Sequence, residues 1–136
     1  MFSISTKGDY GLLMLTAIAN AQAAGKAQVS LSEIAEEKKL SLKYISQLAT
    51  TLKEAGLLNS KEGKGGGYSL TRKPSEITLI QVLEALEGPV EPVKCSSEKK
   101  DACHCEAGCG MKQTWQGATE LLKNYLSSKT LADTLN

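Results

Sequence analysis

All four cysteines of this sequence and its only histidine lie in one short stretch, CSSEKKDACHCEAGCG, which spans residues 95–110. The stretch contains Cys95, Cys103, Cys105 and Cys109, with His104 between the second and third thiols. Thiolates and imidazole are soft ligands, so such a cluster can form disulfides, bind a structural zinc ion or hold an iron–sulfur cluster. The spacing of the thiols and the character of the rest of the chain bear on the choice among these three.

The spacing of the thiols is irregular. Zinc modules usually pair their ligands as C-x₂₋₄-C on two knuckles. Here the pattern is C-x₇-C-x-C-x₃-C, and no C-x-x-C motif of a thioredoxin-like enzyme is present. The irons of an iron–sulfur cluster accept cysteine, and sometimes histidine, from loops, so the spacing alone leaves zinc and iron open. We expect neither an enzyme nor a small-molecule substrate, because His104 is the only base beside a possible thiol nucleophile.

The N-terminal apolar run LLMLTAIANAQA looks like part of a secretory signal peptide. However, Asp9 precedes it, only Lys7 supplies positive charge, and its apolar residues recur at helical spacing. That spacing predicts a helix with one face on a core, formed by Tyr10, Leu13, Met14, Ala17, Ile18 and Ala21. No apolar run approaches the ~18 residues that cross a bilayer. We therefore expect a cytoplasmic protein without membrane contact, where disulfides are rare.

Composition and charge point to one aliphatic domain with a local basic face. The chain has 136 residues, of which 41% are hydrophobic and 4% aromatic, so little aromatic surface is available for stacking on single-stranded bases. The net charge is only +1, but residues 38–73 carry eight Lys/Arg against two Glu. Such a local excess of positive charge is typical of a nucleic-acid-binding face.

Residues 30–56 predict two short helices joined by a tight turn. Ser30 and Glu33 have the spacing of a capping box, Ser41 offers a second N-cap, and Gly56 is a suitable C-terminal stop. The expected inward residues are Leu31, Ile34 and Ala35 in the first helix and Leu42, Ile45, Leu48, Ala49 and Leu52 in the second. Two such helices form a helix-turn-helix.

A hairpin is predicted directly after these helices. Residues 57–60 and 68–71 have β character and flank a tip rich in glycine and lysine. A helix-turn-helix followed by such a hairpin is a winged helix. The tip does not open a helix and lacks a Gly-Lys-Ser/Thr ending, which argues against a nucleotide-binding loop.

Two further helices complete the predicted fold, which is mostly α. Thr78 and Gln81 begin a helix that ends at Gly88. A long C-terminal helix has a seam suited to a partner helix, formed by Met111, Trp115, Ala118, Leu122 and Tyr125, and predicts a homodimer. We expect a winged helix-turn-helix domain at 1–88, a cysteine-rich cluster-binding loop at 89–110, and a dimerisation helix with a C-terminal turn at 111–136.

The predicted partner is double-stranded DNA. The second helix of a helix-turn-helix enters the major groove, and its expected outward residues are Ser41, Lys43, Tyr44, Ser46 and Gln47. The wing is expected to contact sugar and phosphate through Lys61, Lys64, Gly66, Tyr68 and Arg72. The recognition helix would then supply most of the sequence choice and the wing most of the salt-dependent affinity.

Four motifs in order, STKGDYGLLML, SLKYISQL, GKGGGYSL and EGPVEPVKC, resemble the IscR/NsrR-type winged-helix regulators of the Rrf family. The resemblance covers nearly the whole chain. It implies a homodimeric bacterial transcription regulator that binds palindromic DNA. It also implies a loop in which three cysteines hold a 2Fe–2S or 4Fe–4S cluster whose state alters DNA binding, which favours iron over zinc.

The ligand set departs from the family pattern C-x₅-C-x₅-C. Cys103 and Cys109 match its second and third cysteines, Cys95 matches the first with two residues inserted, and Cys105 is extra. Where IscR-like members have a ligating histidine, this chain has Lys112. The fourth ligand is therefore open among Cys105, which proximity favours, His104, and Asp9, which corresponds to the ligating aspartate of NsrR-like members.

We favour a 2Fe–2S cluster, with 4Fe–4S as the other possibility. The competing hypothesis is a cluster-free regulator of the same fold that responds through direct thiol oxidation or through a protein partner.

Overall fold

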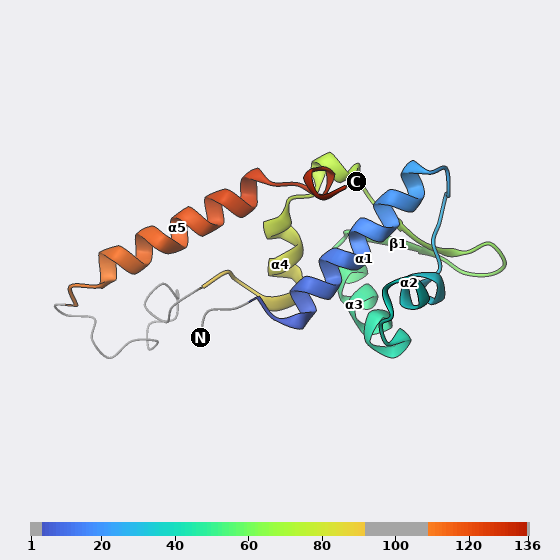
Figure 1. Cartoon of the computed structure of the whole chain (residues 1–136), viewed down its shortest axis with the longest axis horizontal. Coiled ribbons are helices and arrows are strands. Elements are labelled where there is room, and N and C mark those ends of the chain that lie inside the picture. The colour runs from blue at the N-terminus through green and yellow to red at the C-terminus, as the bar shows by residue number, and fades with distance from the viewer. Residues whose placement is uncertain (1–3, 92–108, 136) are drawn as a thin grey trace.

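The computed structural model describes residues 4–91 and 109–135, and within them the chain is mostly helical with one small hairpin (Figure 1). The elements in order are α1 (Thr6–Ala23), α2 (Leu31–Lys38), α3 (Leu42–Glu54), β1 (Leu58–Lys61), β2 (Gly67–Leu70), the 3₁₀ turn η1 (Pro74–Glu76), α4 (Leu79–Glu87), α5 (Lys112–Ser128) and the 3₁₀ turn η3 (Leu131–Thr134). The predicted fold class, a winged helix-turn-helix with a long C-terminal helix, is confirmed. No helix in the described ranges is both long and apolar enough to cross a membrane.

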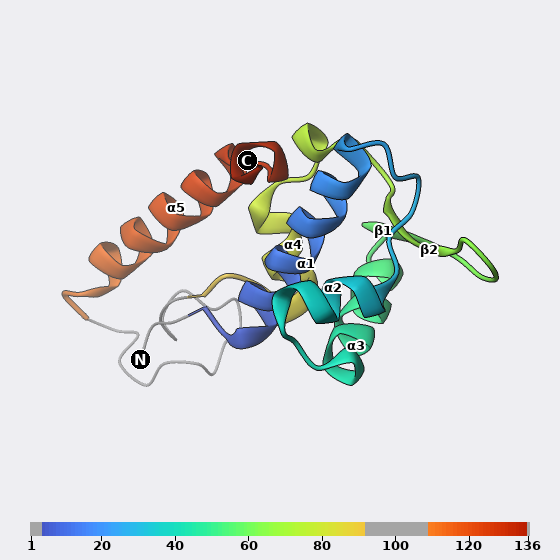
Figure 2. The same cartoon turned by 45° about the vertical axis from the view of Figure 1, so that its right-hand side comes forward.

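The body is built around α1, and α5 extends away from it. Figures 1 and 2 show α1 packed among α3, α4 and the base of the hairpin, with the hairpin and α5 projecting on opposite sides. The core is aliphatic, as the composition requires. Its largest fully buried side chains are Met14, Leu15, Ile18, Ile34, Ile45, Leu52, Leu58, Ile77, Val82 and Leu131.

Two leucines expected in the core are exposed. Leu13 in α1 is 38% exposed and Leu42 at the start of α3 is 47% exposed, whereas Leu15 and Ala19 in α1 are buried. The prediction for α1 assumed a helix with one buried face. Because α1 contacts α3, α4, β2 and η3, its buried arc is wider than one face and is displaced from the predicted stripe.

The predicted N-caps are present, with one difference. The hydroxyl of Ser41 accepts from the N–H of Tyr44 at 3.4 Å, and Thr78 and Gln81 form both bonds of their capping box. The hydroxyl of Ser30 accepts from the N–H of Glu33 at 3.2 Å, but the Glu33 carboxylate does not complete the box. It pairs instead with the ammonium of Lys26 at 3.1 Å, in the loop before α2.

The hairpin strands are antiparallel, with Leu58 opposite Leu70 and Lys61 opposite Gly67. This is a shift of one residue from the predicted ranges. The pairing is the one that the predicted ranges imply, and the N–H of Thr71 still donates to the Leu57 carbonyl at 3.2 Å. A backbone pair between Tyr68 and Val29, with N–O distances of 2.9 and 2.8 Å, joins the hairpin to the loop before α2. Gly67 has a φ of 151°, and a Cβ there would lie 2.5 Å from the Val29 oxygen. Glycine at this position therefore lets the two backbones approach.

The chain returns to the body after α5. The N–H of Leu79 donates to the Lys129 carbonyl and the N–H of Leu131 to the Ile77 carbonyl, both at 2.9 Å. Leu131 is fully buried in the same core as α1 and α3. Its turn is capped by Asp133, and the backbone N–H of Thr130, which donates to that carboxylate at 2.8 Å, lowers the pKa of Asp133 below its ordinary value. The C-terminal end of α5 is thus fixed to the winged domain.

Helices α1 and α4 pack closely because α1 has glycine where the two meet. A Cβ on Gly8 would lie 2.8 Å from Cδ2 of Leu83, and one on Gly11 would overlap Cδ1 of Leu86. The carboxylate of Glu87, the last residue of α4, accepts from the N–H of Ser5 at 2.8 Å and the N–H of Gly8 at 3.3 Å, as well as from the Ser5 hydroxyl. Glu87 therefore caps the N-terminus of α1 from a distant part of the sequence.

We expect Gly11→Ala to lower the free energy of unfolding by about 1–3 kcal/mol, because the added methyl group must displace Leu86 from a filled interface. Gly117→Ala in α5 is the matched control, since nothing lies within 4 Å of its added Cβ. That change should be neutral or stabilising by up to about 1 kcal/mol through helix propensity. Urea unfolding of the two variants at one protein concentration tests this, and equal effects would contradict it.

Candidate nucleic-acid interface and cysteine segment

The outward face of α3 carries a small set of polar groups. Lys43 and Gln47 are exposed and lie one turn apart. Ser41 is exposed, but its hydroxyl oxygen already accepts from the N–H of Tyr44 as the helix cap. Ser46 is half-buried, and its hydroxyl donates to the Leu42 carbonyl at 2.7 Å. Of the predicted α3 residues, only Lys43 and Gln47 present polar side chains without such a bond.

Tyr44 is placed differently from the other predicted α3 residues. Its ring is half-buried and meets the ring of Tyr10 edge-to-face, with centroids 5.8 Å apart and an interplanar angle of 82°. The ring therefore braces the N-terminal turn of α3 against α1 and is not directed outward as predicted. DNA contact by its hydroxyl stays a prediction.

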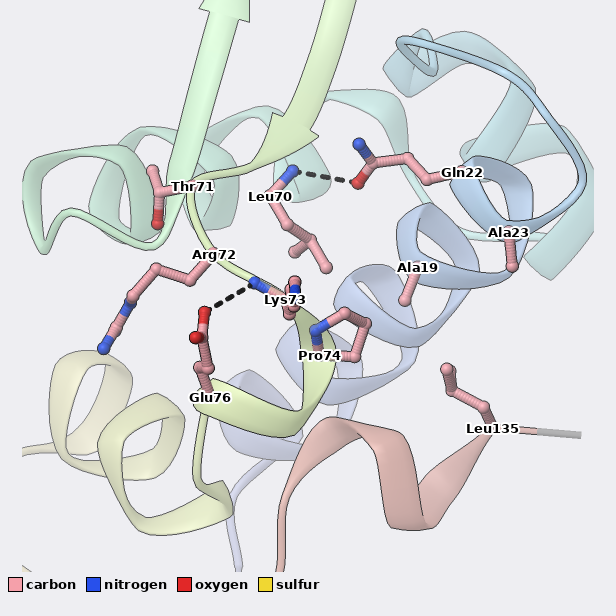
Figure 3. Close-up of a pocket in the computed structure, with 10 residues that line it drawn as sticks. All are labelled: Ala19, Gln22, Ala23, Leu70, Thr71, Arg72, Lys73, Pro74, Glu76 and Leu135. Carbon is pink, nitrogen blue, oxygen red and sulfur yellow. Dashed lines mark hydrogen bonds between the residues drawn. The ribbon is translucent and has the colours of Figure 1, made fainter.

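The wing carries exposed cations close in sequence to its glycines. Lys61 and Lys64 are exposed, and Gly66 lies where a Cβ would overlap the Lys61 carbonyl oxygen. Tyr68 is half-buried on the core. Arg72 is exposed at the wing base, and Figure 3 shows its guanidinium directed away from Ala19, Ala23 and Leu135. The tip and base can thus offer cations and bare backbone to a phosphate chain.

The wing is held at a fixed position relative to α3. The ammonium of Lys53 in α3 donates to the Ser60 hydroxyl in β1 at 2.6 Å. At the wing base, the hydroxyl of Thr71 donates to the carbonyl of Gly56, which follows α3, at 2.7 Å. Lys53 was expected only as part of the basic surface, and its bond to the wing was not visible in the sequence because it joins two elements.

A hollow of about 560 Å³ lies at the wing base, between α1, β2 and η1 (Figure 3). Polar groups around it are bonded to the backbone: the Gln22 side-chain oxygen accepts from the N–H of Leu70, and the Glu76 carboxylate accepts from the N–H of Lys73, both at 3.1 Å. The side chains of Gln22 and Glu76 in this hollow are thus used to hold the wing base to α1 and η1.

The exposed cations of α3 and the wing have no acidic partner in the described ranges. The salt bridges found there are Lys26–Glu33 and Lys38–Glu37. Lys43, Lys61, Lys64 and Arg72 are therefore free to pair with an external anion, so far as the described residues tell. This arrangement fits the basic face predicted from residues 38–73.

Most of the predicted metal ligands lie outside the described residues: Cys95, Cys103, Cys105 and His104. Cys109 is described, with a free and half-buried thiol, and its carbonyl accepts from the N–H of Lys112 at the start of α5. Asp9 is exposed in the first turn of α1. Residues 4–91 and 109–135 do not by themselves bring three potential ligands together.

Helix α5 presents a row of large apolar side chains to solvent. Within the described residues, Leu121 is 72% and Tyr125 57% exposed, and Met111 and Trp115 are also exposed. Of the predicted seam, Ala118 is exposed as well and Leu122 is half-buried. Thr119 and Leu126, which are buried, lie one turn after Trp115 and Leu122 and border this row.

Comparisons with known proteins agree with this geometry. The family model described as Rrf2, iron-dependent transcriptional regulator, matches residues 4–136. The chain is 35% identical to CymR of Bacillus subtilis, over 96% of this chain and 87% of that protein, and 30% identical to IscR of Cereibacter sphaeroides, over 96% and 84%.

Two solved structures show the same fold. CymR, the global cysteine regulator of B. subtilis, superposes with a TM-score of 0.80 and covers 98% of this chain and 96% of its own. T. potens IscR, at 34% identity, has a TM-score of 0.76 and covers 97% and 85%. The match of the family model over almost the whole chain, the winged fold and the basic face of α3 and the hairpin together lead to one conclusion: the chain belongs to the Rrf2 family of transcription regulators.

Proposed function

We propose that two copies of the chain bind one palindromic DNA site, and that an iron–sulfur cluster held by the cysteine segment sets their affinity for it. The single observation that carries the DNA-binding part is the set of exposed cations on α3 and the wing, Lys43, Lys61, Lys64 and Arg72, without acidic partners in the described ranges. Helix α3 would enter the major groove and the wing would lie along the backbone.

The apolar row of α5 supports the dimer. Large apolar patches on a soluble protein mark an interaction surface, and Met111, Trp115 and Tyr125 follow the spacing of a helix–helix seam. A symmetric dimer through α5 would place two recognition helices on one face. Their half-sites would then be about one DNA turn, roughly 34–36 Å, apart.

The donor set fits an iron–sulfur cluster. Cys95, Cys103, Cys105 and Cys109 would hold it, with His104 or Asp9 as alternatives for the fourth position. Iron in such clusters is bound by thiolates, and the one thiol described, Cys109, is free and half-buried. A bound cluster would supply a centre that changes its redox state or is lost on oxidation.

The position of α5 links this segment to DNA binding. Its C-terminal end is fixed to the body by the Leu79–Lys129 and Leu131–Ile77 bonds, while Cys109 lies just before its first residue. Ligation at Cys109 would therefore restrain the other end of the helix that carries the proposed dimer seam. A change in the angle of α5 would alter the spacing of the two recognition helices, and half-site spacing is a strict geometric requirement.

The similarity to CymR favours one alternative, a regulator without a cluster. That relative, 35% identical, is described as a global cysteine regulator. In this alternative the same dimer and DNA face operate, and the thiols respond to oxidant directly or the chain answers to a protein partner. The two hypotheses differ in iron content and not in DNA binding.

We expect Lys61→Ala and Lys64→Ala to weaken binding to all DNA sequences to a similar extent. Each should reduce the slope of log K against log salt concentration by about 0.9, because one phosphate contact is lost. Lys123→Ala, on α5 and away from the wing, is the control and should leave the slope unchanged. Fluorescence anisotropy over a range of potassium chloride concentrations measures the slopes. Unchanged slopes for both wing variants would remove the wing from the interface.

We expect protein purified without oxygen from iron-replete cells to be brown and to contain iron and acid-labile sulfide. Cys103→Ala should lose both, together with the change in operator affinity that air or nitric oxide produces in the wild type. Ser97→Ala is the control: Ser97 lies in the same segment but is not a proposed metal ligand, so this variant should retain the iron, the sulfide and the response. Iron and sulfide assays with gel-shift titrations test this.

Further variants identify the fourth ligand, and the wild-type protein itself distinguishes the cluster-binding regulator from the cluster-free one. Among Cys105→Ala, His104→Ala and Asp9→Ala, the variant whose visible spectrum changes most names that ligand. Colourless wild-type protein whose DNA affinity still changes with peroxide would instead establish the cluster-free regulator.

A further inference from the structure

Leu42, the first residue of α3, is an exception among the apolar residues of that helix. Its side chain is 47% exposed, whereas Ile45, Leu48 and Leu52 are buried in the core. A single exposed leucine is ordinary on a protein surface. Its place, however, is the first turn of the helix that the proposed function puts in the major groove.

Leu42 lies beside the residues expected to face the bases. At 100° per residue, Leu42 and Tyr44 fall on opposite sides of Lys43. The Tyr44 side packs on Tyr10 of α1, so the Leu42 side is the open border of the groove face. Ser46, one turn further on, follows Leu42 on the same border. The N-terminal turns of a recognition helix are the part that reaches base edges.

Three hydroxyl groups of α3 donate their protons to carbonyl groups of the helix itself. Ser46 donates to the Leu42 carbonyl at 2.7 Å, Thr50 to the Ser46 carbonyl at 3.0 Å and Thr51 to the Gln47 carbonyl at 3.2 Å. Their oxygens can only accept. Lys43 and Gln47 retain their donors, and Leu42 adds an exposed apolar side chain beside them.

We infer that Leu42 is a specificity residue that contacts the C5-methyl group of a thymine in each half-site. Thymine is the one standard base with a methyl group in the major groove, and apolar side chains recognise it by direct contact. The inference rests on the proposed role of α3 as the recognition helix. It adds a base-reading contact to that role, at a residue that the sequence pattern placed in the core.

The test is a methyl scan of the operator. A duplex selected by the full-length dimer from a random library is remade with each thymine replaced in turn by deoxyuridine, which lacks only the methyl group. For the wild type, one symmetry-related pair of thymines should show a loss of affinity of roughly three- to tenfold per site. Leu42→Ala should lose a similar factor on the unmodified duplex, and the same deoxyuridine should then have no further effect.

Lys43→Ala is the matched control on the same helix turn. It should weaken binding and reduce the salt slope, yet retain the thymine sensitivity of the wild type. Leu42→Ala is expected to fold, because alanine is a good helix former and the site is exposed.

Two results would overturn the inference while leaving DNA binding by α3 intact. One is a Leu42→Ala variant whose deoxyuridine profile equals that of the wild type. The other is a Leu42→Ala variant that dissociates to a monomer in sedimentation, which would mean that a second copy covers Leu42. If Lys43→Ala and Leu42→Ala both bound the selected duplex as tightly as the wild type, the assignment of α3 as the recognition helix would itself fail.

Discussion

The arrangement of this chain depends on the close packing of α1 against the elements around it. Gly8 and Gly11 let α4 approach without intervening side chains, and Tyr10 holds the first turn of α3 through Tyr44. Gln22 at the other end of α1 holds β2 through the N–H of Leu70. One helix therefore positions α3, the wing and α4, the helix that leads into the cysteine segment. Because interiors are packed as densely as organic crystals, a displacement of α1 must be shared by its neighbours.

The same constraint gives the cysteine segment a physical connection to the DNA face. Glu87 ends α4 just before residues 89–110 and caps α1 at Ser5 and Gly8. A carboxylate at a helix N-terminus satisfies free N–H groups and the helix dipole, which explains why Ser5 does not cap with its own side chain. On the far side of the segment, α5 contacts α4, and backbone hydrogen bonds fix the residues that follow its C-terminal end to the body. The segment therefore joins a rigid support to the free end of the proposed dimer helix.

The sequence predicted what local chemistry decides and missed what distant elements decide. The caps at Ser41 and Thr78 follow from side chains within four residues, and both are present. The backbone pair between Val29 and Tyr68 joins the loop before α2 to the hairpin, and no local pattern could show it. The capping box at Ser30 has only one of its two hydrogen bonds, because the Glu33 carboxylate pairs with the ammonium of Lys26. Helical periodicity could not show that α1 is enclosed on several sides, so the predicted buried face wrongly included Leu13, which is exposed.

The residues of the candidate site also differ in how well the sequence predicts their exposure. Lys43, Gln47, Lys61 and Lys64 are exposed as expected, since charge and polarity keep such side chains at the surface whatever the tertiary contacts. Tyr44 is half-buried against Tyr10 and Leu42 is exposed, because the burial of apolar and aromatic residues depends on which neighbouring elements cover them. The cysteines illustrate the limit of spacing as a guide: four thiols define a soft donor set, but which four atoms bind one group depends on the path of the chain between them.

Affinity and sequence choice therefore have different origins in this chain. In the proposed function, the wing cations act on any phosphate backbone and their effect falls with salt, so they would bring the protein to DNA without selecting a site. In the proposed function, selection comes from α3, where carbonyl groups of the helix accept the hydroxyl protons of Ser46, Thr50 and Thr51. On such a face, an apolar contact at Leu42 would add to the hydrogen bonds that Lys43 and Gln47 can donate. Each such contact contributes little, so discrimination would depend on both half-sites being engaged together, and hence on the dimer geometry that α5 sets.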